Sequence, residues 1–108
     1  MITFITHLRV KSANAAAFQA LMTDMCMMVR KHEPDILYYE FALSAEDPEI
    51  FVVVEVYRDV KAHTAHMESE WVQSSLPKSA RLIEGGKYDI KQYVSPGTEP
   101  VRRRWTAE

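Results

Sequence analysis

The chain has 108 residues, of which 47% are hydrophobic and 26% charged, and its formal net charge is −2. This length fits one domain with one core, and the weak acidity gives no electrostatic reason to expect nucleic acid or a membrane as a partner. The single cysteine, Cys26, excludes an internal disulfide. No apolar run reaches the ~20 residues of a membrane span, and the first twenty residues do not read as a signal peptide, so we expect a cytoplasmic protein.

The first third of the chain predicts a strand followed by a helix. Residues 2–10 are rich in β-branched and aromatic types that alternate between two faces. Ser12 or Asn14 can cap the helix that follows. Apolar residues recur at spacings of three and four over residues 14–32, which predicts one apolar stripe. Its methionines favour a core of flexible side chains over a soft-metal or adaptable binding surface.

The middle of the chain predicts a β-hairpin. Glu33-Pro34-Asp35 ends the helix, because the residue before a proline avoids the helical region. Residues 36–44 and 50–58 both read as strands, with Leu37 and Tyr39 on the same face of the first. The turn of about five residues that joins them predicts antiparallel pairing.

The last third predicts helical segments and a final strand. Asp59 and Ser69 are good N-cap residues for a short helix and for a second segment after it. Pro77 is tolerated in a first turn or at a kink, and the helix restarts over residues 78–84. Gly85-Gly86 stops it, and residues 87–94 form the last strand.

The predicted order is β-α-β-β-α-β, the ferredoxin-like plan of an α+β protein with an antiparallel sheet. This domain spans residues 1–94, and residues 95–108 are a polar tail. The plan puts helices on one face of the sheet only, yet both faces of the strand at 50–58 are largely apolar. A second subunit packed sheet to sheet would cover the other face, which predicts a homodimer.

Glu55 is a candidate for proton transfer, because it interrupts an apolar strand. Removing a carboxyl from water raises its pKa toward neutrality, where it serves as a base. The alternative is a strand-end glutamate that is paired with Arg9 or with another cation, or that faces solvent.

His66 is the second catalytic candidate, as a proton acceptor, a proton donor or a hydrogen-bonding group for a substrate. With His63 and Glu70 it lies near one helical face, a spacing that can bind a metal. A stable site needs further ligands, so no metal and no cofactor is predicted. The alternative is a helix-face histidine without a role.

Aromatic rings with a few polar groups make a pocket for a flat apolar ligand. The rings are ordinary core in the alternative reading, and Cys26 is predicted to be an inert core thiol. The run Arg102-Arg103-Arg104-Trp105 reads as a solvated tail or as a segment that docks on the partner subunit. The residues predicted to bind substrate are Tyr39, Phe51, Tyr57, Trp71 and, on the first strand, His7.

Three segments, in order and at matching separations, resemble the antibiotic biosynthesis monooxygenase family over roughly residues 3–94. The segment from Glu33 to Glu40 resembles its Glu-Pro-Gly-Cys-x-x-Tyr motif, and the segment from Phe51 to Tyr57 resembles its third strand. Residues 62–69 resemble its Ala-x-x-x-His-x-x-Ser helix.

Departures from the family pattern reduce the number of family activities that we expect of this chain. Asp35 replaces the frequent glycine after the proline, and Trp71 stands where a second histidine is often found. The haem-degrading members of the fold use an asparagine, a tryptophan and a histidine, and the polyketide oxidases use a tryptophan and an asparagine that are not evident here. Haem degradation is not expected, because the three aligned positions hold Thr6, His66 and Leu76.

The resemblance implies a dimeric α+β barrel with a pocket between sheet and helices in each subunit. It also implies a cofactor-independent monooxygenase that oxidises a small quinol- or anthrone-like aromatic with molecular oxygen. Glu55, His66 and Tyr39 carry over as site residues, with Trp71 as a substituted neighbour. The fold also hosts isomerases, so the alternatives are a small-molecule isomerase or a non-catalytic dimeric ligand-binding or stress-response module.

Overall fold

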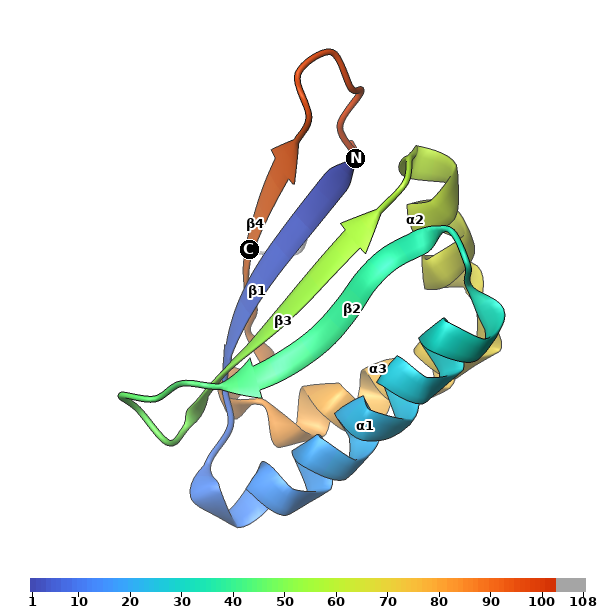
Figure 1. Cartoon of the computed structure of the whole chain (residues 1–108). Helices are drawn as coiled ribbons and strands as arrows, with labels where there is room; N and C mark the ends of the chain where they lie inside the picture. The colour runs from blue at the N-terminus through green and yellow to red at the C-terminus, as the bar shows by residue number, and fades with distance from the viewer. Residues whose placement is uncertain (103–108) are drawn as a thin grey trace.

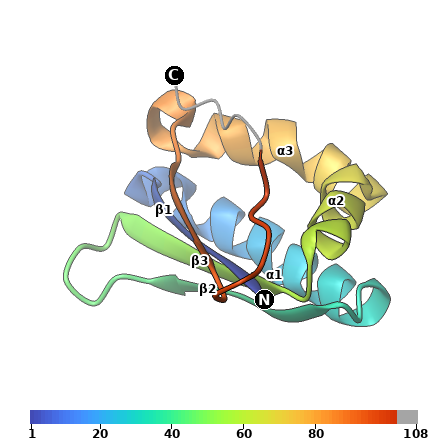
Figure 2. The same ribbon diagram turned by 90° about the horizontal axis from the view of Figure 1, so that it is seen from above.

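A computed structural model describes residues 1–102 as one antiparallel sheet with helices on one of its faces (Figure 1). Figure 2 shows the two layers from above, with the strands on one side and the helices on the other. The elements in chain order are β1 (Ile2–Arg9), a 3-10 turn (Ser12–Asn14), α1 (Ala15–His32), β2 (Ile36–Leu43), β3 (Ile50–Tyr57), α2 (Val60–Glu68), α3 (Glu70–Leu82), a second 3-10 turn (Glu84–Gly86) and β4 (Asp89–Val94).

The strand order in the sheet is β2-β3-β1-β4, and every neighbouring pair is antiparallel. The first and last strands of the chain therefore lie side by side, and the hairpin β2–β3 occupies the other half of the sheet. This confirms the predicted α+β ferredoxin-like plan. A sheet of this kind leaves one face for the helices and one face free of them.

A β-bulge in β2 changes which side chains face the helices. Ile36 pairs with Tyr57 and Tyr38 with Val56, so Leu37 has no partner of its own. Ile36 consequently packs against the core, and Leu37 is 44% exposed. The expectation that Leu37 and Tyr39 share one face of the strand is wrong, because one extra residue in β2 reverses the alternation.

The predicted caps hold for α2 and α3, where Asp59 accepts from the backbone N–H of Ala62 and Ser69 from that of Val72. The expected cap of α1 is absent, since neither Ser12 nor Asn14 makes a side-chain capping bond. The α3 helix also continues through Pro77 instead of restarting after it. Pro77 removes one backbone hydrogen bond from α3. The packing of α3 against α1 offsets this loss.

The core lies between the sheet and the helices, in two clusters of buried side chains. The smaller cluster includes Val101, so the start of the predicted polar tail belongs to the fold. The side-chain amide of Gln92 accepts from Val101 N at 2.7 Å and donates to Val101 O at 3.1 Å. The rest of the basic run predicted at the tail, Arg103 to Trp105, lies outside the described residues.

The sheet face opposite the helices carries apolar side chains that no described element covers. Val52, Val54 and Val56 of β3 lie on this face and are half-buried. Tyr38 of β2 and Tyr93 of β4 are 52% and 56% exposed. No helix in residues 1–102 is long and apolar enough to cross a membrane.

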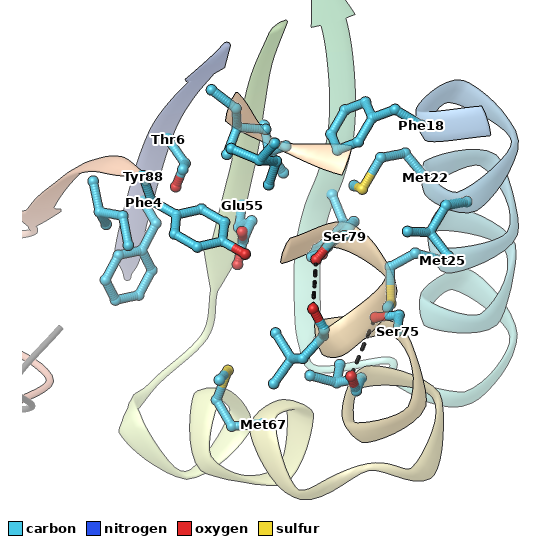
Figure 3. A pocket seen from close by; sticks show the side chains of 18 of the residues that line it. Phe4, Thr6, Phe18, Met22, Met25, Glu55, Met67, Ser75, Ser79 and Tyr88 are labelled. Carbon is cyan, nitrogen blue, oxygen red and sulfur yellow. Dashed lines mark hydrogen bonds between the residues drawn. The ribbon is translucent and has the colours of Figure 1, made fainter. Parts of the chain in front are cut away.

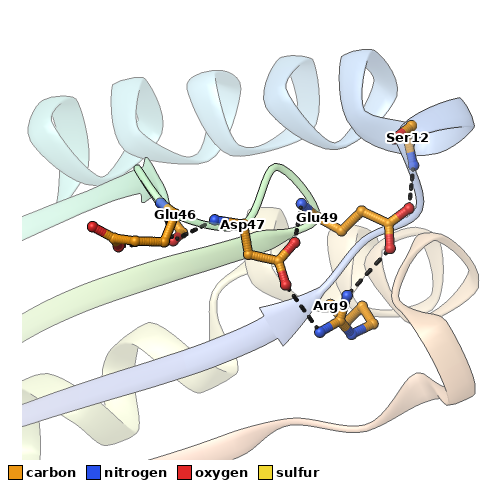
Figure 4. A network of polar contacts seen from close by, with 6 residues as sticks. Arg9, Ser12, Glu46, Asp47 and Glu49 are labelled. Carbon is orange, nitrogen blue, oxygen red and sulfur yellow. Dashed lines mark hydrogen bonds and ion pairs between the residues drawn. The ribbon is translucent and has the colours of Figure 1, made fainter.

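Arg9 at the end of β1 anchors the turn between β2 and β3 (Figure 4). Its guanidinium donates to Asp47 and to Glu49, each at 3.2 Å, and the backbone N–H of Ser12 donates to Glu49 at 3.4 Å. These carboxylates raise the pKa of Arg9 further, and the pKa of Asp47 is lowered mainly by its hydrogen bond from the backbone of Glu49. Arg9 is therefore engaged at the surface and is not the partner of Glu55.

Candidate functional site

A cavity of about 780 Å³ lies between the sheet and the three α-helices. Figure 3 shows Met22 and Met25 of α1 facing Thr6 and Glu55 of the strands across this space. A volume of this size suits a small organic ligand, and most of the lining is apolar. The polar and charged residues in the lining are Thr6, Glu55, His63, His66, Ser75, Ser79 and Lys87.

Three of the predicted site residues line the cavity together: Tyr39 from β2, Glu55 from β3 and His66 from α2. They are far apart in the chain, and the sheet register brings Tyr39 directly opposite Glu55. Tyr57 does not line the cavity. It lies behind Glu55, completely buried.

The remaining predicted residues lie outside the cavity lining. Phe51 is 1% exposed and packs its ring 4.9 Å from that of Phe18, so it is core. His7 is exposed on the opposite face of the sheet, because β1 turns Thr6 and Leu8 toward the helices. Trp71 contacts the site indirectly, through a hydrogen bond described below.

Glu55 is a half-buried carboxyl group that accepts a hydrogen bond from a phenol. The hydroxyl of Tyr57 donates to Glu55 Oε1 at 2.5 Å. Burial raises the pKa of the Glu55 carboxyl, and the Tyr57 hydrogen bond and the nearby His66 only partly oppose this. Burial and the nearby Glu55 also raise the pKa values of Tyr39 and Tyr57 well above 10, so both phenols keep their protons at neutral pH.

His66 is joined to Glu33, which stands at the end of α1. Glu33 Oε2 lies 2.9 Å from His66 Nδ1, and the indole N–H of Trp71 donates to the same oxygen at 2.7 Å. The side chains of His66 and Glu33 are 4% and 9% exposed. Ser69 fixes this corner by donating to the carbonyl of His66 while it caps α3.

Aromatic rings surround the two histidines of α2. The ring of His63 lies 4.9 Å from those of Phe4 and Tyr57, and the ring of His66 lies 5.2 Å from that of Tyr39. Both histidines are 3% exposed. An imidazole packed among rings at the wall of a cavity is positioned to contact a flat ligand.

The metal alternative for His63, His66 and Glu70 lacks a geometric basis. Both histidines are buried, whereas Glu70 is exposed at the start of α3. Among residues 1–102, no group of three histidine, cysteine, aspartate or glutamate side chains is arranged to hold a metal ion. Cys26 is buried in the core, and burial raises the pKa of its thiol to about 11, which agrees with an inert role.

Sequence reasoning assigned no role to Glu33. A signal for it exists in the sequence, because the C-terminal end of a helix repels a negative charge and seldom ends on a glutamate without compensation. Here the compensation comes from His66 and Trp71, which are 33 and 38 residues away in the chain. Such distant partners are brought together only by the packing of α2 and α3 against the end of α1.

The model of one protein family, antibiotic biosynthesis monooxygenase, matches residues 1–75. This match includes Glu33, Tyr39, Glu55, His66 and Trp71. A search of curated proteins returned no match.

Solved structures share the fold. A candidate antibiotic biosynthesis monooxygenase from Caulobacter crescentus is 22% identical, with a TM-score of 0.81, and the match covers 87% of this chain and 88% of that one. Another from Deinococcus radiodurans is 17% identical, with a TM-score of 0.79 and coverage of 95% and 100%. A candidate monooxygenase from Lactobacillus acidophilus is 17% identical, with a TM-score of 0.80, and the match covers 86% of this chain and 43% of that one. At these identities the likeness establishes the fold.

Proposed function

Because the chain belongs to the antibiotic biosynthesis monooxygenase family, we propose that its cavity binds a small quinol- or anthrone-like aromatic molecule that molecular oxygen oxidises there without a cofactor. One observation carries the proposal: Glu55 and His66, two groups able to accept a proton, line the same largely apolar cavity. The family suggests both the reaction class and the kind of substrate, and the cavity supplies two groups able to accept its proton.

The cavity wall favours a flat, electron-rich ligand. Phe4 and Tyr39 contribute rings, and the methionines of α1 contribute polarisable thioethers that adapt to a ring face or edge. A ligand held here loses most of its water, so a hydroxyl group on it needs a hydrogen-bond partner from the protein. Glu55 and His66 are such partners.

Proton removal is the step that the protein performs. Either His66 or Glu55 accepts the phenolic or enolic proton, and burial, which raises the pKa of Glu55, makes its carboxylate a stronger base than one in water. The resulting substrate anion is electron-rich enough to reduce oxygen directly. The protein thus contributes orientation, desolvation and a base.

The oxidation balances without an external reductant. In an anthrone, the methylene carbon becomes a carbonyl, which releases four electrons, and one oxygen molecule takes up all four. One of its oxygen atoms enters the product, and the other leaves as water with the two hydrogens that the carbon lost. No flavin, haem or metal is required by this stoichiometry.

We also propose that the protein acts as a homodimer formed through the helix-free face of the sheet. Val52, Val54 and Val56 form an apolar strip in the middle of this face, and Tyr38 and Tyr93 lie exposed near its edges. Apolar area of this kind favours burial against a second copy, because a two-fold axis lets the same surface serve both partners.

Oxygen uptake tests the proposed reaction. The wild type is supplied with a panel of quinols and anthrones, with autoxidation subtracted, and compared with His66→Ala and Glu55→Gln. We expect saturable uptake that falls at least ~100-fold in one of the two variants, since general-base catalysis contributes factors of this order. If a folded wild-type protein gives no uptake above background, the oxygenase proposal is wrong, and the isomerase and binding-module alternatives take its place.

A further inference from the structure

One carboxylate oxygen of Glu33 contacts two ring nitrogens, one from α2 and one from α3, and both of these helices line the cavity. Oε2 lies 2.9 Å from Nδ1 of His66 on α2 and 2.7 Å from Nε1 of Trp71 on α3. The Glu33 and His66 side chains are more than nine-tenths buried. The contact is therefore shielded from competing water, and its geometry is stabilised by two independent elements of the fold.

This contact decides which nitrogen of His66 carries the proton. An ionised carboxylate only accepts hydrogen bonds, so a neutral imidazole next to it places its hydrogen on Nδ1. The other ring nitrogen, Nε2, then has a free lone pair and acts as an acceptor.

Nε2 is accessible from the cavity. Among residues 1–102, His66 makes no further side-chain hydrogen bond, yet no polar side-chain atom there is both buried and unsatisfied. Nε2 must therefore reach accessible surface, although the whole residue is only 3% exposed. Because His66 lines the cavity, that surface is the cavity wall.

We infer that Glu33 positions His66 as a hydrogen-bond acceptor in the cavity, so that the site selects aromatic ligands carrying a hydroxyl group at this point over their methyl ethers. The inference rests on the proposed function for the aromatic character of the ligand, but the role of Glu33 does not depend on any reaction. An ether presents only an oxygen lone pair to the lone pair of Nε2, which leaves both acceptors unpaired in a dry site.

The tautomer of His66 tests the role of Glu33 without any ligand. Nitrogen-15 spectra of histidine-labelled protein distinguish a protonated from an unprotonated ring nitrogen, and His66→Asn assigns the signals. We expect His66 to carry its hydrogen on Nδ1 in the wild type and in Glu55→Gln, which removes the carboxylate that lines the cavity. In Glu33→Gln we expect a mixture of tautomers. A wild-type His66 protonated on Nε2 alone would overturn the inference, whether or not any variant folds.

Ligand selectivity is measured with a pair of probes that do not react with oxygen on this timescale, 2-naphthol and 2-methoxynaphthalene. We expect the wild type to bind the naphthol at least ~10-fold more tightly than its methyl ether, and the ratio to fall severalfold in Glu33→Gln. Ser74 is exposed on α3 and supplies the matched control Ser74→Ala, in which we expect the ratio to stay unchanged. Equal affinities in the wild type, or an unchanged ratio in Glu33→Gln, would contradict the inference.

The nitrogen-15 spectra and the binding comparison together distinguish a failure of this inference from a failure of the proposed function. If neither naphthalene binds, the aromatic-ligand site is wrong and the selectivity claim falls with it, while the tautomer of His66 still decides the role of Glu33. If the naphthol binds selectively but no quinol or anthrone consumes oxygen, the positioning role stands and the oxygenase proposal fails.

Discussion

The hydroxyl of Tyr57 donates a 2.5 Å hydrogen bond to the carboxyl of Glu55, two residues earlier on the same strand. Residues two apart on a strand share a face, so both side chains point toward the helices. Tyr57 is fully buried and Glu55 lines the cavity, which makes the tyrosine a support from behind. The hydrogen bond holds a carboxyl group at the wall of an apolar cavity. There the carboxylate can accept a proton from a ligand, but removing its charge from water destabilises the fold.

Glu55→Gln is expected to stabilise the protein at neutral pH. Burial raises the pKa of Glu55 above its unfolded value, so the folded state binds the proton more tightly, and stability falls as pH rises through the unfolded and then the folded pKa. Glutamine removes this loss and still accepts from Tyr57. Denaturant unfolding at pH 4 and pH 7 should show a stability advantage of the variant at pH 7 that shrinks at pH 4.

Other groups also act on the pKa of Glu55, so the wild type and Glu55→Gln are compared at each pH, where these groups are the same in both proteins. Glu33 raises the pKa of Glu55 and His66 lowers it, and both remain in the variant. An advantage of Glu55→Gln that is the same at both pH values, or larger at pH 4, would contradict the assigned cause.

A large side chain introduced into the cavity from α3 should weaken ligand binding without unfolding the protein. Ser75 lines the cavity, whereas its neighbour Ser74 is exposed, and each hydroxyl donates to the carbonyl three residues earlier. We expect Ser75→Phe to weaken the binding of an aromatic probe by at least ~10-fold, or about 1.4 kcal/mol. Ser74→Phe is the matched control, and similar losses in both variants would show that the ligand binds elsewhere.

Cys26 should be unreactive in the folded protein. Burial raises the pKa of its thiol from the ordinary 9.0 to about 11, which lowers the thiolate fraction near pH 8 by about 100-fold, and the residue is 2% exposed. A disulfide reagent should label the thiol at the rate at which the protein opens, and rapidly in denaturant. Labelling of the native protein as fast as that of a free thiol would show that Cys26 is accessible.

A charge in the middle of the helix-free sheet face should separate the proposed dimer. Val54 pairs with Ile5 of β1 and Glu40 of β2, which places it near the centre of this face. We expect Val54→Lys to elute as a monomer when the wild type is a dimer, with the mass determined by light scattering. Met27→Lys, at a 57% exposed site on α1, should leave the mass unchanged.

A wild type that is monomeric at micromolar concentration would contradict the dimer proposal directly. A Val54→Lys protein that stays dimeric would place the interface on another surface. Circular dichroism of both lysine variants confirms that each remains folded, because an aggregated or unfolded variant would not report on the interface.

Local patterns in the sequence determined most of the secondary structure. Several predicted features depend on neighbours within a few residues, and all of them appear in the structure: the alternation of residues 2–10, the β-branched run of 50–58, the helical stripe of 14–32 and the caps at Asp59 and Ser69. The element order then leaves few antiparallel arrangements, so the α+β plan follows as well. The sequence did not predict the bulge at Leu37 or the uninterrupted α3 helix, because packing against other elements decides both features.

For the site, the sequence by itself singled out Glu55 and His66, since an acid inside an apolar strand and a histidine on a short helix are unusual in their local settings. Only the tertiary structure decided that they share a cavity, that Phe51 and His7 lie outside its lining, and that Glu33 holds His66. The reason is physical: hydrogen bonds such as those from His66 and Trp71 to Glu33 join residues more than thirty positions apart. Their existence depends on how α2 and α3 close over the end of α1, which no local pattern encodes.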